Sequence, residues 1–116
     1  MRITDTVLRD RIIQVMGDPE STQLLHSMRH TPKDAQTLSR ETGIPLSSVY
    51  RKLAALRSAG LSMTSSFVLT PEGKRQDLLV AAVTDVRIGI RGEEIEVDLT
   101  PTQQNANRIW FEMFRS

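Results

Sequence analysis

The segment from residue 47 to residue 58 carries the side chains best suited to contact a binding partner. As a helix, it places Val49, Leu53 and Leu56 on one apolar face. The opposite face carries no carboxylate and consists of Ser47, Ser48, Arg51, Ala54, Ala55 and Ser58, flanked by Tyr50 and Arg57 on one side and Lys52 on the other. Small residues let a helix enter the DNA major groove, where arginine bonds guanine or phosphate and serine hydroxyls hold phosphates. The pattern favours a DNA-contacting helix over an ordinary solvent-exposed one.

The residues before this segment predict a second helix that would position it. Ala35 and Leu38 share one face, and Gly43 follows where a left-handed residue is wanted. Ile44 returns to the core, and we expect Ser47 to cap the next helix, which Gly60 closes. Two helices joined by a tight glycine-containing turn form a helix-turn-helix.

Helix-opening signals recur along the rest of the chain. A capping oxygen precedes a proline at Asp18, Thr31, Thr70 and Thr100, and Asp5 precedes an amphipathic segment. These signals predict helices at about 6–16, 19–30, 32–42, 71–84 and 101–115.

Two further stretches predict β-hairpins. The first is short, over about 61–69, with Thr64, Ser65 and Ser66 as its turn. The second alternates apolar and polar residues on both sides of Gly92-Glu93, which we take as a two-residue turn. Ile90 then faces Ile95, Ile88 faces Val97 and Val86 faces Leu99. On the other face Arg91 meets Glu94 and Arg87 meets Asp98, so one register satisfies both faces.

Composition limits the class of protein. The 116 residues are 39% hydrophobic and 25% charged, as in a folded protein of one domain with added elements. There is no cysteine, which excludes disulfides and thiolate metal sites. No membrane span or signal peptide is evident, so we expect a cytoplasmic protein. Residues 31–75 carry seven cationic and three acidic side chains, whereas residues 76–116 carry four and seven, which suggests an anionic partner for the middle segment.

Several short motifs together resemble those of ArsR-type winged-helix transcription regulators of archaea and bacteria. Asp18-Pro19 before a Leu24-Leu25 helix resembles their opening, and residues 38–53, LSRETGIPLSSVYRKL, resemble their helix-turn-helix. Residues 59–61, AGL, and residues 69–73, LTPEG, are also similar to such regulators. The resemblance covers about residues 18–75. It implies a homodimer on double-stranded DNA, with the helix from Ser47 in the major groove and the hairpin around Ser65 as a short wing.

Two features of this chain depart from that family pattern. The expected wing tip, residues 64–66, is uncharged, and the cysteines of the metal-sensing motif are absent. We therefore expect no thiolate metal sensing and a weak backbone grip by the wing.

The expected fold class is mainly α with β-hairpins: a winged helix-turn-helix with an added hairpin and a C-terminal helix. The expected parts are an N-terminal helix at 1–17, the DNA-binding domain at 18–75 and a dimerisation part at 76–116. The side chains expected to contact DNA are Ser47, Ser48, Tyr50, Arg51, Lys52, Ala55, Ser65 and Ser66. The final helix is rich in aromatic residues. They could complete the core of the protomer or join two protomers, since aromatic residues are enriched in the cores of protein interfaces. The residues expected at a dimer interface are Ile109, Trp110, Phe111, Met113, Phe114, Leu8 and Ile12.

Other chemistry has little support in the sequence. His26 and His30 are four residues apart on a predicted helix but have no third ligand nearby, so we expect no metal. Gly89 and Gly92 do not form a phosphate loop, and we expect neither a cofactor nor an enzyme activity. The alternative to a DNA-binding regulator is a winged-helix module that binds other proteins and not DNA.

Overall fold

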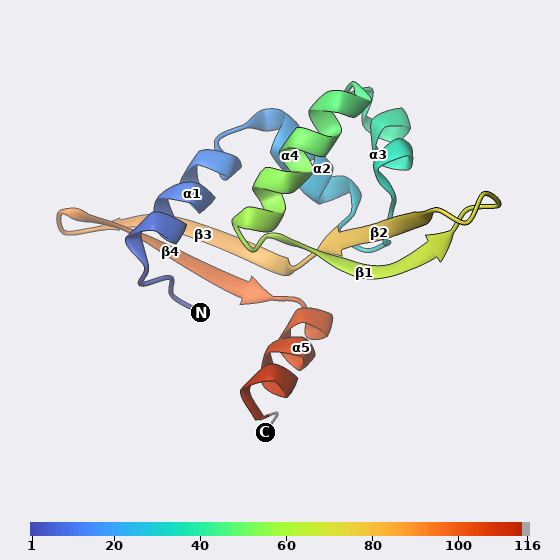
Figure 1. The fold of residues 1–116 in the computed structure, drawn as a ribbon. Helices are drawn as coiled ribbons and strands as arrows, with labels where there is room; N and C mark the ends of the chain where they lie inside the picture. The colour runs from blue at the N-terminus through green and yellow to red at the C-terminus, as the bar shows by residue number, and fades with distance from the viewer. Residues whose placement is uncertain (115–116) are drawn as a thin grey trace.

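The computed structural model describes the backbone of residues 1–114 and the side chains up to Ile109. It is a winged helix-turn-helix with an added β-hairpin and a C-terminal helix, as the sequence predicts. In Figure 1 helices α1 to α4 lie together on one side of two β-hairpins, and α5 extends from β4 on the other side. The elements are α1 (Thr6–Met16), α2 (Pro19–Ser27), α3 (Ala35–Thr42), α4 (Leu46–Ser58), β1 (Ser62–Leu69), β2 (Arg75–Ala81), β3 (Val83–Arg91), β4 (Glu94–Pro101) and α5 (Gln103–Phe114).

Aspartate caps fix the starts of the first three helices. Asp5 accepts hydrogen bonds from the backbone N–H groups at the start of α1, and Asp18 does the same for α2. The predicted start of α3 at Pro32 is wrong, because Asp34 caps that helix and Lys33 instead pairs with β2 through a β-bridge to Leu79. Helix α2 also ends at Ser27, three residues before the predicted end.

One hydrophobic core joins α1 to α4 with the second hairpin. The predicted inward stripe of α4 is confirmed, with Val49 and Leu56 fully buried and Leu53 6% exposed. Val97 and Leu99 of β4 belong to the same core. The largest fully buried side chains are Ile12, Leu24, Met28, Leu38, Leu56, Leu61, Val49 and Val97.

The first hairpin is longer than the sequence predicts. Strand β1 continues through the serines to Leu69 and pairs antiparallel with β2, with a β-bulge between Thr64 and Ser66. The predicted helix at 71–84 is therefore wrong. Thr70 starts a tight turn in which its carbonyl accepts from the Gly73 N–H at 2.8 Å, and its hydroxyl accepts from the Lys74 N–H at 3.1 Å. The turn needs a left-handed residue, which Gly73 supplies with φ +79°.

The second hairpin has the register that the sequence predicts. Strands β3 and β4 pair Ile90 with Ile95, Ile88 with Val97, and Val86 with Leu99, around a turn at Gly92. Its apolar face is covered only near the core: Val97 is fully buried, whereas Ile88 is 46% and Ile90 82% exposed.

The predicted ion pairs across the second hairpin are replaced by others. Arg87 pairs with Asp85 on its own strand at 2.8 Å, and Arg91 lies 4.0 Å from Glu96. Asp98 lies opposite Arg87 but pairs with Arg2 at 3.6 Å, because residues 1–3 run along β4 through a β-bridge from Arg2 to Asp98. The Ile3 N–H donates to the Val97 carbonyl at 2.9 Å, and the Leu99 N–H donates to the Met1 carbonyl at 2.8 Å.

Candidate nucleic-acid interface

The turn between α3 and α4 is fixed by local hydrogen bonds. Gly43 adopts φ +77°, and its N–H donates to the Ser39 carbonyl. The Ser39 hydroxyl donates to the Ile44 carbonyl at 2.6 Å, and the Thr42 hydroxyl donates back to Leu38 at 2.6 Å. Ile44 is buried at 3% exposure. Backbone and core together therefore hold α4 at a set angle to α3, as in a helix-turn-helix.

The start of α4 has no side-chain cap. Pro45, not Ser47, occupies the N-cap position, and it makes no side-chain hydrogen bond. The first N–H groups of a helix point outward and carry partial positive charge. Ser47 is exposed and Ser48 is half-buried beside them. This end of α4 is thus open to an anion such as a DNA phosphate.

The outward face of α4 carries cations and no carboxylate. Tyr50 is 57% exposed, and Arg51, Ala54 and Arg57 are exposed along the same side of the helix. Among the residues with described side chains, none forms an ion pair with Arg51 or Arg57. The face is therefore free to meet a polyanion.

Lys52 does not belong to this free face. Its ammonium group lies 2.6 Å from an Asp18 carboxylate oxygen and 3.5 Å from Glu20, both on or next to α2. Its side chain is only 15% exposed. The hydrogen bond from Lys52, helped by that from Ser21, lowers the pKa of Asp18 to about 2, and the same contact raises the pKa of Lys52. Lys52 thus ties α4 to α2, and its predicted DNA contact would require this pair to open.

Ala55 and Ser58 both contact other parts of the protein, although Ser58 stays exposed. Ala55 is half-buried and packs against the core. The Arg11 guanidinium of α1 donates to the Ser58 hydroxyl at 2.8 Å. The exposed part of α4 is therefore narrower than the sequence predicts and centres on Tyr50, Arg51, Ala54 and Arg57.

The wing, which we define as β1, β2 and their turn at residues 70–74, is held beside α4 by the loop before α3. Lys33 and Leu79 exchange backbone hydrogen bonds of 2.9 and 2.8 Å. The Gln76 amide donates to the Asp34 carboxylate at 2.7 Å, and Asp34 also caps α3. Lys33 and Asp34, which lie just before α3, thus connect the wing to the helix-turn-helix.

The turn of the wing is charged, contrary to the predicted uncharged tip. Lys74 lies at the turn together with Glu72, and Arg75 follows as the first residue of β2. Arg75 stacks on Phe67, with 4.3 Å between the guanidinium carbon and the ring centre, and it pairs with Asp77 at 2.8 Å. Among the described side chains, none forms an ion pair with Lys74 at the tip.

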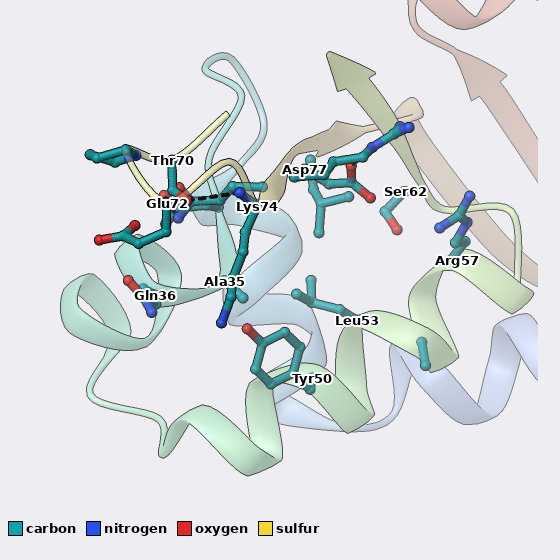
Figure 2. Close-up of a pocket in the computed structure, with 16 residues that line it drawn as sticks. Ala35, Gln36, Tyr50, Leu53, Arg57, Ser62, Thr70, Glu72, Lys74 and Asp77 are labelled. Atoms are coloured by element: carbon teal, nitrogen blue, oxygen red, sulfur yellow. Dashed lines mark hydrogen bonds and ion pairs between the residues drawn. The ribbon is translucent and has the colours of Figure 1, made fainter. Parts of the chain in front are cut away.

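A groove of about 840 Å³ separates α4 from the wing. Figure 2 shows Tyr50, Leu53 and Arg57 of α4 along one side, and Thr70, Glu72 and Lys74 of the wing along the other. Its charged lining is mixed: the cations are Arg57, Lys74 and Arg75, and the carboxylates are Asp34, Glu72 and Asp77. Sequence reasoning missed Lys74 and Arg75, although the left-handed turn signal at Gly73 was available to find them.

The predicted DNA contacts at Ser65 and Ser66 are displaced from the wing tip. Both residues lie at the bulge of β1, on the part of the wing nearer the core. The Gln104 amide of α5 donates to the Ser65 hydroxyl at 3.3 Å. This contact links the wing to α5 and leaves Ser66 exposed on the strand.

The predicted dimer residues fall into three groups. Ile12 is fully buried and Leu8 packs against the core of its own protomer, so Ile12 has no surface for a partner. Ile109 is 36% exposed on α5. The side chains of Trp110, Phe111, Met113 and Phe114 lie outside the described residues.

The described part of the chain contains neither a metal-ligand cluster nor a membrane-spanning helix. No group of three or more histidine, aspartate or glutamate residues there could hold a metal ion, and both His26 and His30 are exposed. None of the described helices is long and apolar enough to cross a membrane.

Comparison with known proteins finds similarity among solved structures. No protein-family model matches the chain, and no curated protein matches it. Among solved structures, the chain is similar to reduced HlyU from Vibrio cholerae N16961, at 14% sequence identity and a TM-score of 0.45. The similarity covers 97% of this chain and 94% of that chain.

Proposed function

We propose that this protein is a sequence-specific DNA-binding regulator of transcription that acts as a homodimer. The observation that carries the proposal is the exposed face of α4, where Tyr50, Arg51, Ala54 and Arg57 stand without a carboxylate beside a groove. In this arrangement Arg51 bonds a guanine edge or a phosphate, and the small Ala54 lets the helix approach the base pairs. The uncapped start of α4 receives a phosphate.

The wing supplies the second contact in this proposal. Lys74 at its turn and Arg57 on α4 line opposite sides of the groove. Phosphate contacts of this kind fix the position of the protein on the duplex, while the side chains of α4 discriminate between sequences. Ser65 and Ser66, which lie away from the turn, contribute less than the sequence suggests.

Two copies would bind more tightly than one. A single reading helix makes few phosphate contacts and binds weakly at physiological salt. A two-fold dimer presents two such helices about 34 Å apart to a near-palindromic site. We place the DNA-binding part at residues 18–81, because a boundary after residue 75 would cut β2. Residues 1–17 and 82–116 then pack against this DNA-binding part or join the two protomers. We place the protein in the cytoplasm.

The experiment is selection of bound sequences from a random DNA pool, followed by affinity measurements on the selected duplex. We expect a near-palindromic motif, and we expect Arg51→Ala to weaken binding and to relax the sequence preference at one base pair per half-site, at a cost of about 1–3 kcal/mol. Arg9→Ala is the matched control, since Arg9 lies on α1 and pairs with Asp10. Equal affinity of the wild type and Arg51→Ala for every sequence would contradict the proposal.

A second function is favoured by one specific observation. The outer part of β1 exposes three apolar side chains in succession: Phe67 at 50%, Val68 at 44% and Leu69 at 65%. Phe67 and Leu69 share one face of the strand, because side chains alternate along it, and exposed apolar pairs of this kind favour a surface that binds another protein. A winged-helix module that binds proteins would show no retention on DNA at low salt, together with a stable partner of different sequence that Phe67→Ser releases.

A further inference from the structure

The two outer edges of the second hairpin differ in whether another segment of the chain pairs with them. The outer edge of β4 is covered by residues 1–3, through the bonds from Ile3 to Val97 and from Leu99 to Met1. The outer edge of β3 pairs with no other strand among residues 1–114. Residues 87–91 are exposed along this edge. An exposed strand edge with apolar side chains is a template for pairing with another chain.

The register shows which backbone groups are unpaired. Arg91 and Glu94 flank a two-residue turn, so they exchange hydrogen bonds, and hydrogen-bonded pairs then recur at every second residue. The N–H and C=O groups of Val86, Ile88 and Ile90 therefore point away from β4. The same alternation explains why the backbone N–H and C=O groups of Val97 and Leu99 point away from β3 and form hydrogen bonds with residues 1–3.

We propose that β3 pairs antiparallel with β3 of a second copy of this chain, with Ile88 on the two-fold axis. In this register Ile88 faces Ile88 of the partner subunit, and Val86 faces Ile90 of the partner subunit. The two hairpins form one four-stranded sheet, and the exposed isoleucines of both copies join into one apolar strip. Asp85 lies opposite Arg91 of the partner subunit, and this pair occurs twice by symmetry.

Charge selects this register over its neighbours. Centring the pairing on Gly89 would set Arg87 opposite Arg91 of the partner subunit. Centring it on Arg87 would set the two copies of Arg87 opposite each other. Like charges directly opposite are destabilising in a sheet, whereas the Ile88 register sets opposite charges together and Arg87 against a glycine. A second copy thus fits this edge in both polarity and charge.

This β3 contact would join the two protomers of the homodimer in the proposed function. It can be tested without DNA. The free end of the second hairpin and the turn of the wing lie at opposite ends of the molecule in Figure 1. Changes at Ile88 therefore leave the exposed face of α4 in place. Failure of β3 pairing would move the dimer contact elsewhere, for example to α5, and would leave DNA binding to be judged by Arg51→Ala.

The first test is cross-linking of single-cysteine variants of the full chain, which has no cysteine of its own. We expect Ile88→Cys to form a disulfide-linked dimer on mild oxidation, because cross-strand neighbours lie within disulfide reach. Ile95→Cys is the matched control: Ile95 is 43% exposed, close to the 46% of Ile88, but lies on β4. Equal cross-linking of the two variants, or a monomeric mass for the wild type at the same concentration, would overturn the proposal.

The second test exchanges the charges that set the register. Arg91→Asp would place two carboxylates opposite each other at both ends of the paired strands, and we expect the dimer dissociation constant to rise by at least about tenfold. Adding Asp85→Arg to this variant restores opposite charges and should return the dissociation constant close to that of the wild type. Circular dichroism checks that each variant is folded. An unchanged dissociation constant for Arg91→Asp, or no recovery in the double variant, would refute the register.

Discussion

The two β-hairpins of this protein differ in what specifies them. The β3–β4 hairpin follows from its own sequence, since alternating apolar residues on both sides of a glycine turn allow only one register. The β1–β2 hairpin has serines in its first strand and depends on a distant partner, the bridge from Lys33 to Leu79. A hairpin whose partner lies outside its own segment is hidden from local patterns, and here that hairpin is the wing.

The hairpins also differ in the charge that they present. The wing turns at Glu72 and Lys74 next to the groove, whereas the β3–β4 hairpin turns at Arg91, Glu93 and Glu94 beside the exposed Ile90 and Ile95. Under our proposals the first meets DNA and the second meets another protomer. Three predictions test this division and a fourth tests the contact behind α4, in order of decreasing expected effect.

The largest effect is expected within the second hairpin, between its buried and its free end. Val97→Ala removes two methyl groups from a fully buried site and should lower the free energy of unfolding by about 2 kcal/mol. Ile90→Ala, at a site 82% exposed, should change it by less than about 0.5 kcal/mol at concentrations where the protein is monomeric. Urea unfolding of both variants measures the difference, and equal losses would mean that the free end is covered within the protomer.

The two turn glycines should give equal costs in stability but different effects on DNA binding. Gly73 and Gly92 have φ of +79° and +63°, so alanine at either should cost about 1–2 kcal/mol. Gly73→Ala displaces Lys74 and should also weaken DNA binding, whereas Gly92→Ala should not. Urea unfolding together with fluorescence anisotropy on the selected duplex distinguishes these effects. The same loss of DNA affinity in both variants would remove the distinction between the hairpins.

Single cations on the two hairpins should differ in their effect on DNA affinity. Lys74→Ala removes one phosphate contact, which should weaken binding several-fold on all sequences and reduce the salt slope by about 0.9. Arg87→Ala is the control at protein concentrations where both variants are dimeric, because Arg87 is 82% exposed on β3 and far from the groove. Titrations with DNA at several salt concentrations check this. A larger loss of DNA affinity for Arg87→Ala than for Lys74→Ala would mean that DNA contacts the β3–β4 hairpin and not the wing.

The smallest effect concerns the pair of Asp18 and Lys52 behind α4. The folded protein lowers the pKa of Asp18 to about 2, chiefly through the Lys52 hydrogen bond, so the stabilisation is present above the unfolded pKa of about 4. It should be lost as the pH falls from about 4 through about 2. Thermal unfolding across this range should show a shallower pH dependence for Asp18→Asn than for the wild type. Parallel curves would show that the pair contributes nothing.

Sequence patterns predicted the elements whose information is local. The helix 6–16, its Asp5 cap, the left-handed Gly43 and the register of the second hairpin are all confirmed. The helix predicted at 71–84 failed because Thr70-Pro71 opens a turn as readily as a helix, and the pairing of β2 with β1 and Lys33 decides between them.

The candidate site was predictable in part for the same reason. Helical periodicity placed Tyr50 and Arg51 on the outward side of α4, and both are exposed. It could not show that Lys52 would be bound by Asp18, 34 positions earlier in the chain. Nor could it show that Lys74 would face α4 across a groove, since that requires the wing to be long.

The salt dependence of DNA binding tests the central claim most directly. The observed association constant of the wild type on the selected duplex should fall linearly with salt on a logarithmic scale. Removing both free cations of α4, in Arg51→Ala/Arg57→Ala, should reduce that slope by about 1.8 and weaken binding at every salt concentration. A slope and affinity equal to those of the wild type would show that α4 does not face the DNA.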